Sequence, residues 1–265
     1  MSAMNDSKTM CKQYANPDGL SIRMALHSKY STNQQPFGDW ISQHYHIQPG
    51  MRVLELGCGT GSMWREPERW LPDGASLVLT DFSHGVLETA RETVPHRANI
   101  RFEQMDIQDI RFEEASFDLV IANMMLYHVP DLNRALAEVA RVLRPGGRFI
   151  CATSGENGLS AWLQRVLGAG EAPKIPFSLQ NGGAALQKFF AKVDMHVRED
   201  ALNVTSVDDL TDYVLSMADF AFVREWPQDR LQALLAQQME DGIIHIPKEY
   251  GLFQCCDVNV TKIFD

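Results

Sequence analysis

The sequence has little positive charge and no long hydrophobic run. Its 265 residues carry 24 Lys and Arg against 34 Asp and Glu, a formal net charge of −10. Because so acidic a surface repels a phosphate backbone, we do not expect nucleic acid as a partner. No apolar run approaches the ~18 residues of a membrane-crossing helix: the longest, residues 119–129, is interrupted by Asn123 and His128. Residues 1–8 lack the apolar core of a signal peptide, so we expect no membrane partner.

Cysteines are few and lack C-x-x-C spacing. There are five of them: Cys11, Cys58, Cys151, Cys255 and Cys256. An odd number without that spacing indicates reduced thiols in a cytoplasmic protein, and excludes a disulfide framework or a zinc site as the organising feature. His44, His46 and His245 form no recognisable ligand set, so we expect no metal.

The feature around which the chain is organised is a glycine-rich turn after a short apolar run. Residues 53–56 predict a buried parallel strand, and the next five residues contain Gly57, Gly59 and Gly61. Residues 62–64 then open a predicted short helix, which Pro67 disturbs. A strand, a glycine turn and a helix N-terminus form the arrangement that binds nucleotide-like cofactors.

Two residues of this stretch disfavour a dinucleotide. The G-x-G-x-x-G fingerprint needs glycine at position 62, where this chain has Ser62. Glu55 stands in the strand, two residues before the first glycine. Its carboxylate would repel a pyrophosphate but would suit an amino group or a hydroxyl. The spacing therefore favours a cofactor with a cationic or hydroxyl-rich head.

Four further strands with helices between most of them follow over about one hundred residues. The strands are expected at 77–80, 99–105, 117–122 and 148–153. Ser83 and Asp131 are predicted to cap the helices that follow the second and fourth strands, and residues 145–147 end the latter helix. This order predicts an α/β fold with a doubly wound, Rossmann-like parallel sheet.

The alternation of strands and helices ends after residue 153. Helices are expected at 159–167, 184–191, 207–218 and 228–241, and strands at 193–198 and 251–263, with residues 243–247 as a candidate lead-in to the last strand. We expect one structural domain plus a cap, whose segments are N-terminal lid helices (1–48), a cofactor-binding core (49–153), a helical cap inserted in the second half (154–250) and a C-terminal strand of the sheet (251–265).

Polar side chains are expected to gather where the central strands end, because ligands of open α/β sheets bind outside the carboxyl ends of the strands. Asp81, 20 residues after Gly61, stands where an acid would meet two ribose hydroxyls. Asp106 could accept a hydrogen bond from an adenine amino group, with Phe82 and Ile107 lining the ring. Asn123 ends the fourth strand.

Residues 50–153 contain five successive motifs: V-L-E-L-G-C-G-T-G, L-T-D-F-S, F-E-Q-M-D-I, F-D-L-V-I-A-N and R-V-L-R-P-G-G-R-F. In this order they resemble the motifs of the class I S-adenosylmethionine-dependent methyltransferases of the small-molecule type. The resemblance implies a seven-stranded, mostly parallel sheet with a reversed last hairpin, S-adenosylmethionine as cofactor and S-adenosylhomocysteine as product.

The resemblance also implies roles for the residues at the strand ends. Glu55 and the glycine loop, Cys58 included, would face the methionine portion. Asp81 would bind the ribose and Asp106 the adenine, while Asn123 and Met124 would flank the sulfonium side.

Some side chains allow two interpretations. His128 is either a general base for an oxygen or nitrogen nucleophile, or a residue capping the loop before the Asp131 helix. His27 and Tyr30 either close over the cofactor or pack within their helix. Arg23 either pairs with a carboxylate of cofactor or substrate, or is solvated.

The sequence therefore predicts a cytoplasmic methyltransferase, monomeric or homodimeric, that acts on a small organic molecule. Oxygen or nitrogen is favoured over carbon as the acceptor. Two alternatives stay open: an NAD-dependent oxidoreductase, which Ser62 and Glu55 disfavour, and a non-catalytic protein that binds S-adenosylmethionine as a regulator.

Overall fold

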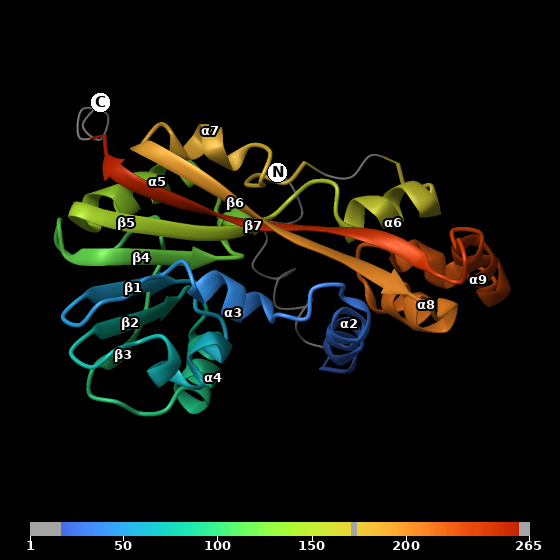
Figure 1. Cartoon of the computed structure of the whole chain (residues 1–265), viewed down its shortest axis with the longest axis horizontal. Helices are drawn as coiled ribbons and strands as arrows, with labels where there is room; N and C mark the ends of the chain where they lie inside the picture. Colours follow the sequence, from blue (N-terminus) through green and yellow to red (C-terminus); the bar gives the residue numbers. More distant parts are fainter. Residues whose placement is uncertain (1–16, 171–173, 260–265) are drawn as a thin grey trace. The chain divides into compact units, whose positions relative to one another are not determined.

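The computed structural model describes residues 17–170 and 174–259; Cys11 and the end of the strand expected at 251–263 lie outside these ranges. The chain divides by its internal contacts into two units (Figure 1). The sheet unit comprises residues 35–154, 175–197 and 251–265, and the accessory unit residues 1–34, 155–174 and 198–250. The expected N-terminal segment 1–48 is thus shared between the units, as is the expected cap, 154–250.

The sheet has seven strands, as the resemblance implies. In spatial order they are β3 (Ile100–Gln104), β2 (Ser76–Asp81), β1 (Arg52–Leu56), β4 (Phe117–Asn123), β5 (Leu143–Ser154), β7 (Ile244–Val258) and β6 (Phe190–Val204). The pairs from β3 to β5 are parallel. Figure 1 shows β7 running back against β6, which makes the last hairpin the reversed one. The predicted mostly parallel, Rossmann-like architecture is confirmed.

Side-chain alternation along the central strands builds a core on each face of the sheet. Leu54 and Leu56 of β1 pack on the face covered by α5 (Leu132–Val142) and α7 (Gly182–Leu186). Val53 and its neighbours pack on the opposite face, with α3 (Phe37–Ser42) and α4 (His84–Thr93). Covering both faces leaves the strand ends as the part of the sheet that can meet a ligand.

The two capping residues predicted from the sequence are confirmed. Ser83 Oγ accepts a hydrogen bond from the backbone N–H of Val86 at 3.4 Å, and α4 begins at the next residue. Asp131 Oδ1 accepts one from the N–H of Arg134 at 3.0 Å at the start of α5. Each carboxyl or hydroxyl oxygen satisfies a helix N–H that has no intrahelical partner.

The structure departs from the expected elements after the glycine turn. The short helix expected there is two single turns of 3₁₀-helix, η2 (Ser62–Trp64) and η3 (Pro67–Arg69). Pro67 accounts for the break, because its ring and missing N–H prevent an α-helix from continuing through it.

The last helix and hairpin of the sheet unit also differ from expectation. The helix expected at 184–191 is α7, which ends at Leu186, and β6 starts at Phe190 instead of 193. β7 starts at Ile244, so it includes most of the candidate lead-in at 243–247 as well as the strand expected from 251. Phe189 and Phe190 continue an apolar pattern that suits a helix, but both are buried in the core of the sheet unit. Burial and strand pairing thus overrode the local pattern.

The accessory unit combines helices with the outer parts of β6 and β7. Its helices are α2 (Pro17–Tyr30), α6 (Leu159–Leu167), α8 (Val207–Ser216), η5 (Ala221–Glu225) and α9 (Gln228–Ala236). Their apolar faces share one core with Leu202 and Ile246 of the two strands. Within the described ranges, every helix is too short or too polar to cross a membrane.

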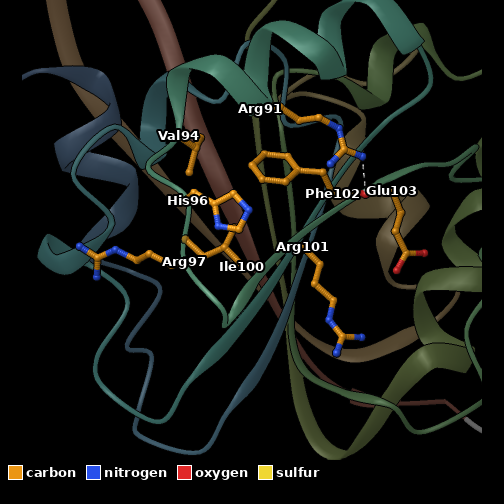
Figure 2. A pocket seen from close by; sticks show the side chains of 8 residues that line it. All are labelled: Arg91, Val94, His96, Arg97, Ile100, Arg101, Phe102 and Glu103. Atoms are coloured by element: carbon orange, nitrogen blue, oxygen red, sulfur yellow. Dashed lines mark hydrogen bonds between the residues drawn. The ribbon is translucent and has the colours of Figure 1, made fainter.

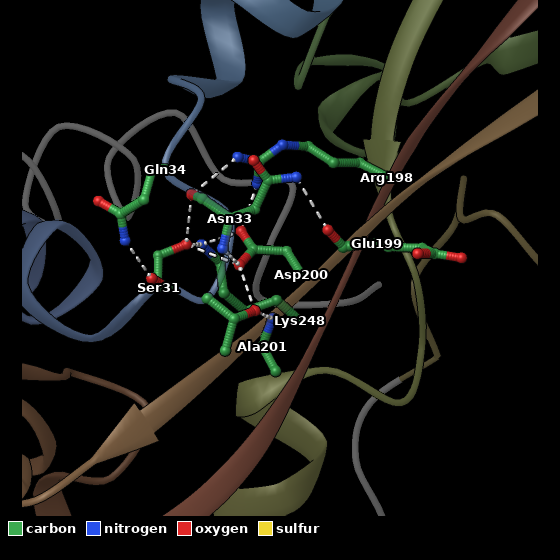
Figure 3. Close-up of polar contacts among 9 residues, drawn as sticks. Ser31, Asn33, Gln34, Arg198, Glu199, Asp200, Ala201 and Lys248 are labelled. Carbon is green, nitrogen blue, oxygen red and sulfur yellow. Dashed lines mark hydrogen bonds and ion pairs between the residues drawn. The ribbon is translucent and has the colours of Figure 1, made fainter.

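A buried carboxylate fixes the start of the accessory unit to its strands (Figure 3). The side chain of Asp200 is 0% exposed and forms ion pairs with Arg198 and with Lys248, the latter at 2.6 Å. Its other oxygen accepts hydrogen bonds from Ser31 Oγ at 2.6 Å and from the N–H of Asn33 at 3.1 Å. Burial alone would raise the pKa of Asp200, but these donors lower it to about 2.

We expect Asp200→Asn to destabilise the protein by about 3–5 kcal/mol, because it leaves two buried cations without their counter-charge. Urea unfolding at pH 7 measures the loss. Lys192→Ala, which removes an exposed ion pair with Asp257, is the control and should change stability by less than about 0.5 kcal/mol.

The contribution of Asp200 should also depend on pH. Since its pKa is depressed from 3.8 to about 2, the stabilisation is present above pH 3.8 and is lost as the pH falls toward 2. Equal stabilities of the wild type and the Asn variant at pH 7 would contradict this assignment.

Candidate functional site

The residues predicted to bind a ligand lie at the carboxyl ends of adjacent strands of the sheet unit. The glycine loop follows β1, Asp81 ends β2 on one side of it, and Asn123 ends β4 on the other. Asp106 follows β3, next to β2. Parallel pairing brings these ends to the same edge of the sheet, as the sequence predicts.

The glycine loop is held to β2 by hydrogen bonds from its backbone. The N–H of Cys58 donates to the carbonyl of Thr80 at 2.8 Å, and the N–H of Gly59 donates to Asp81 Oδ2 at 3.0 Å. Thr80 Oγ1 in turn donates to the carbonyl of Glu55 at 2.8 Å. The loop is therefore preorganised by its own neighbours.

Two glycines of the loop are needed for different reasons. Gly61 has φ +71°, and a Cβ added there would lie 2.6 Å from a methyl carbon of Val94. Gly59 has φ +58°, but an added Cβ would have no described atom within 4 Å. Gly61 therefore allows close packing against the end of α4, whereas Gly59 leaves open space beside the loop, where a ligand could approach the backbone.

Glu55 is almost completely buried at the end of β1, with 2% of its surface exposed. Its Oε2 accepts a hydrogen bond from the indole Nε1–H of Trp64 at 2.5 Å, and Oε1 faces Asn123 Nδ2 at 3.5 Å. The Asn123 amide also donates to the hydroxyl of Tyr45 at 2.7 Å. The carboxylate thus sits among neutral donors, with no described cation bonded to it.

This environment makes Glu55 hard to ionise. Burial raises its pKa from 4.5 to about 7, against the opposing effect of the hydrogen bonds from Trp64 and Asn123. Burial likewise raises the pKa of Tyr45 well above its ordinary value, and the nearby Glu55 charge adds to the effect. A cation brought by a ligand would favour the ionised carboxylate.

Asp81 and Cys58 flank the open side of the loop. Asp81 Oδ1 accepts a hydrogen bond from the N–H of Ser83 at 2.9 Å, and each of its oxygens keeps a lone pair for a further donor. Burial raises the pKa of the Cys58 thiol, and the charges of Glu55 and Asp81 raise it further. Both effects disfavour the thiolate, which is the nucleophilic form of cysteine.

The residues expected around an adenine are arranged unequally. Asp106 Oδ1 accepts a hydrogen bond from the N–H of Gln108 at 2.8 Å, and the Gln108 side chain also donates to it. Phe82 is 65% exposed, which leaves its ring available for stacking. Ile107 is 6% exposed and packs in the core.

Asn123 and Met124 show two features typical of a binding site. Among the described residues, no donor reaches the buried Oδ1 of Asn123. Met124 has φ +54°, a backbone conformation that is unusual for a residue other than glycine. Its N–H donates to the carbonyl of Ala152 at 2.8 Å. An unsatisfied buried acceptor and a strained backbone both cost free energy, and both are common where a ligand binds.

His128 ends the 3₁₀-helix η4 (Leu126–His128) just after these residues, and its ring contacts that of Tyr127 edge to face. Tyr30 lies in the accessory unit, where its hydroxyl donates to Asp209 at 2.5 Å. His27 and Arg23 lie in the same unit: His27 packs against Tyr213, and Arg23 donates to the carbonyl of Ser216 at 3.0 Å.

Three residues that shape the site were missed in the sequence. Tyr45 and Trp64 are 1% exposed and stack on each other with ring centroids 6.2 Å apart. From the sequence alone, neither can be distinguished from an ordinary core aromatic. Gln108 carries no motif signal. The presence of a buried acid in β1 was the one clue that donors such as Trp64 had to exist nearby.

A separate hollow of about 400 Å³ lies beside α4 and β3 (Figure 2). Its lining includes Val94, His96, Ile100 and Phe102, and the side chains of Arg97 and Arg101 point away from one another in the view. The hollow lies along residues 100–103 of β3. Its lining includes none of the residues of the strand-end site, so it is distinct from that site.

Comparison with known proteins relates the sheet unit to methyltransferases. Residues 54–151 match the family model described as methyltransferase domain. A demethylmenaquinone methyltransferase from Symbiobacterium thermophilum is 34% identical over 124 residues, which cover 43% of this chain and 49% of that protein. The hybrid PKS-NRPS synthetase gkaA of Penicillium citrinum is 29% identical over 262 residues, covering 85% of this chain and 7% of that protein. The chain thus spans about half of the first relative and a small part of the second.

A solved structure shares the fold. Phosphoethanolamine N-methyltransferase 2 of Haemonchus contortus, in complex with S-adenosyl-L-methionine, aligns with a TM-score of 0.56 and 17% identity, covering 97% of this chain and 60% of that one. At this identity the likeness concerns the fold alone.

We expect the buried Glu55 to make stability depend on pH. The pKa of Glu55 is raised from 4.5 to about 7 in the folded protein, so the folded state binds this proton more tightly than the unfolded state. The buried acid therefore does not lower the free energy of unfolding below pH 4.5, and it lowers that free energy increasingly as the pH rises toward 7. Between pH 4.5 and 7.5, the free energy of unfolding of the wild type should fall by up to about 3 kcal/mol relative to that of Glu55→Gln.

Urea unfolding of both proteins across this range measures the difference. Glu113→Gln, at an exposed position, is the control and should run parallel to the wild type. A Glu55→Gln curve parallel to that of the wild type would show that the carboxylate is not held in an apolar environment.

Proposed function

We propose that this chain, whose residues 54–151 match the methyltransferase domain family, uses S-adenosylmethionine to transfer a methyl group to an oxygen or nitrogen atom of a small organic molecule. The observation that carries the proposal is the ordered set of polar groups at the ends of β3, β2, β1 and β4. The family match supports methyl transfer over nicotinamide chemistry.

The residues at these strand ends suit the parts of S-adenosylmethionine in order. Asp106 and the exposed Phe82 would meet the adenine, and Asp81 the ribose hydroxyls. The open space at Gly59 would admit the chain between ribose and sulfur. The ammonium group would bind between Asn123 Oδ1 and the buried Glu55. It would give Asn123 Oδ1 a hydrogen-bond donor, and it would add a positive charge to the neutral donors around Glu55.

When bound, S-adenosylmethionine supplies a methyl group already activated on a sulfonium sulfur. The protein then has to align the acceptor with the S–CH₃ bond and exclude water. A thiol nucleophile is not needed, in keeping with the neutral Cys58. His128 would take the proton from a hydroxyl acceptor, while an amine acceptor that is already neutral needs no base.

The free cysteines and the net charge support the proposal of a cytoplasmic enzyme that acts on a small molecule. Each cysteine in the described ranges is a free thiol. The net charge of −10 disfavours nucleic acid as the acceptor. Monomer and homodimer both remain compatible with the proposal.

We expect Asp81→Ala to weaken binding of S-adenosylhomocysteine by about 1–3 kcal/mol, because the ligand loses a charged acceptor and the loop loses its bond from Gly59. Titration calorimetry measures the affinity. Asp73→Ala, at an exposed turn, is the control. An unchanged affinity for the Asp81 variant would show that the ribose is bound elsewhere; absence of binding by the wild type at millimolar ligand would reject the proposed cofactor.

Turnover separates an enzyme from a regulatory protein that binds the same cofactor. We expect radiolabel from methyl-labelled S-adenosylmethionine to appear in hydroxylated or amine acceptors, and His128→Ala to slow transfer to hydroxyls by about 10²-fold or more while sparing neutral amines. Labelling of carbon alone, in hydroquinone acceptors, would contradict the oxygen or nitrogen assignment.

A further inference from the structure

The hydroxyl of Tyr45 is a buried polar group that core packing does not require. Tyr45 is 1% exposed, and its ring stacks against Trp64 in the core of the sheet unit. Phenylalanine would fill the same space. A buried hydroxyl costs free energy unless it is bonded, and the bond it makes is with Asn123, whose Nδ2 donates to it at 2.7 Å.

This bond, together with the contact to Glu55, holds the Asn123 amide in place. The amide nitrogen is directed at two acceptors, the Tyr45 hydroxyl and Glu55 Oε1. The carbonyl Oδ1 is consequently turned away from both, and it is the atom that no described donor reaches. Without the hydroxyl, the amide nitrogen keeps only the longer contact with Glu55 Oε1 at 3.5 Å, which holds the amide less firmly.

We propose that Tyr45 is a positioning residue of the cofactor site, which holds the Asn123 carbonyl ready for the ammonium group of the cofactor's amino-acid end. The proposal rests on the proposed function and adds a residue that lies outside every sequence motif of the site. It acts through Asn123, because the Tyr45 ring is enclosed by the core.

The order of the strands supports assigning this residue to the amino-acid end. Asp81 and Asp106 lie on the β2 and β3 side of the glycine loop, where ribose and adenine would bind. Asn123 ends β4, on the opposite side of β1. A ligand that spans the loop therefore brings its other end to Asn123 and to the carboxylate of Glu55.

The test compares two ligands that differ by this end. S-adenosylhomocysteine carries the amino acid, whereas 5′-methylthioadenosine keeps the adenosine and the sulfur but lacks the amino-acid group. We expect Tyr45→Phe to lower the affinity for S-adenosylhomocysteine about tenfold. The affinity for 5′-methylthioadenosine should stay within about twofold of the wild-type value, and calorimetry measures both affinities. Tyr213→Phe, at a buried tyrosine of the accessory unit, is the matched control and should change neither affinity.

A double-mutant cycle tests whether Tyr45 acts through Asn123. If it does, Tyr45→Phe should have no further effect on S-adenosylhomocysteine affinity in an Asn123→Ala background. Additive losses would overturn the inference, as would an equal loss for both ligands or no loss at all. Retained binding of 5′-methylthioadenosine shows that the variant is folded, and a wild type that binds neither ligand would reject the proposed cofactor instead.

Discussion

The structure of the strand-end site depends on the burial of one carboxylate. Glu55 is 2% exposed, and a carboxyl group in such a place needs hydrogen-bond donors. Trp64 provides one from the segment after the glycine loop, and Asn123 provides another from the end of β4. The need to satisfy Glu55 thus ties together the end of β1, the loop that follows it and the neighbouring strand.

The turn of 3₁₀-helix after the loop carries the residue that contacts Glu55. Here η2 ends at Trp64, and the indole reaches back to Glu55 at 2.5 Å. Pro67, which prevents the longer helix, is therefore consistent with a loop fixed by a side chain and not by a helix that follows it.

The sequence predicted what depends on local pattern and missed what depends on packing. Apolar runs and caps located the central strands, Ser83 and Asp131, and the ends of the strands located Asp81, Asp106 and Asn123. Tyr45 has no such signal, because a buried aromatic with a functional hydroxyl has the same pattern as one without it. The helix expected at 184–191 failed for the related reason that Phe189 and Phe190 fit a helical stripe but are buried by the sheet.

Asp200 and Glu55, two buried carboxylates among the described residues, show how environment changes the ionisation of an acid. Asp200 meets two cations and several neutral donors, and its pKa falls to about 2. Glu55 meets neutral donors, and burial raises its pKa to about 7. Asp200 is already neutralised within the accessory unit and gains nothing from a ligand. No described cation is bonded to Glu55, so a cationic ligand group would stabilise its ionised form.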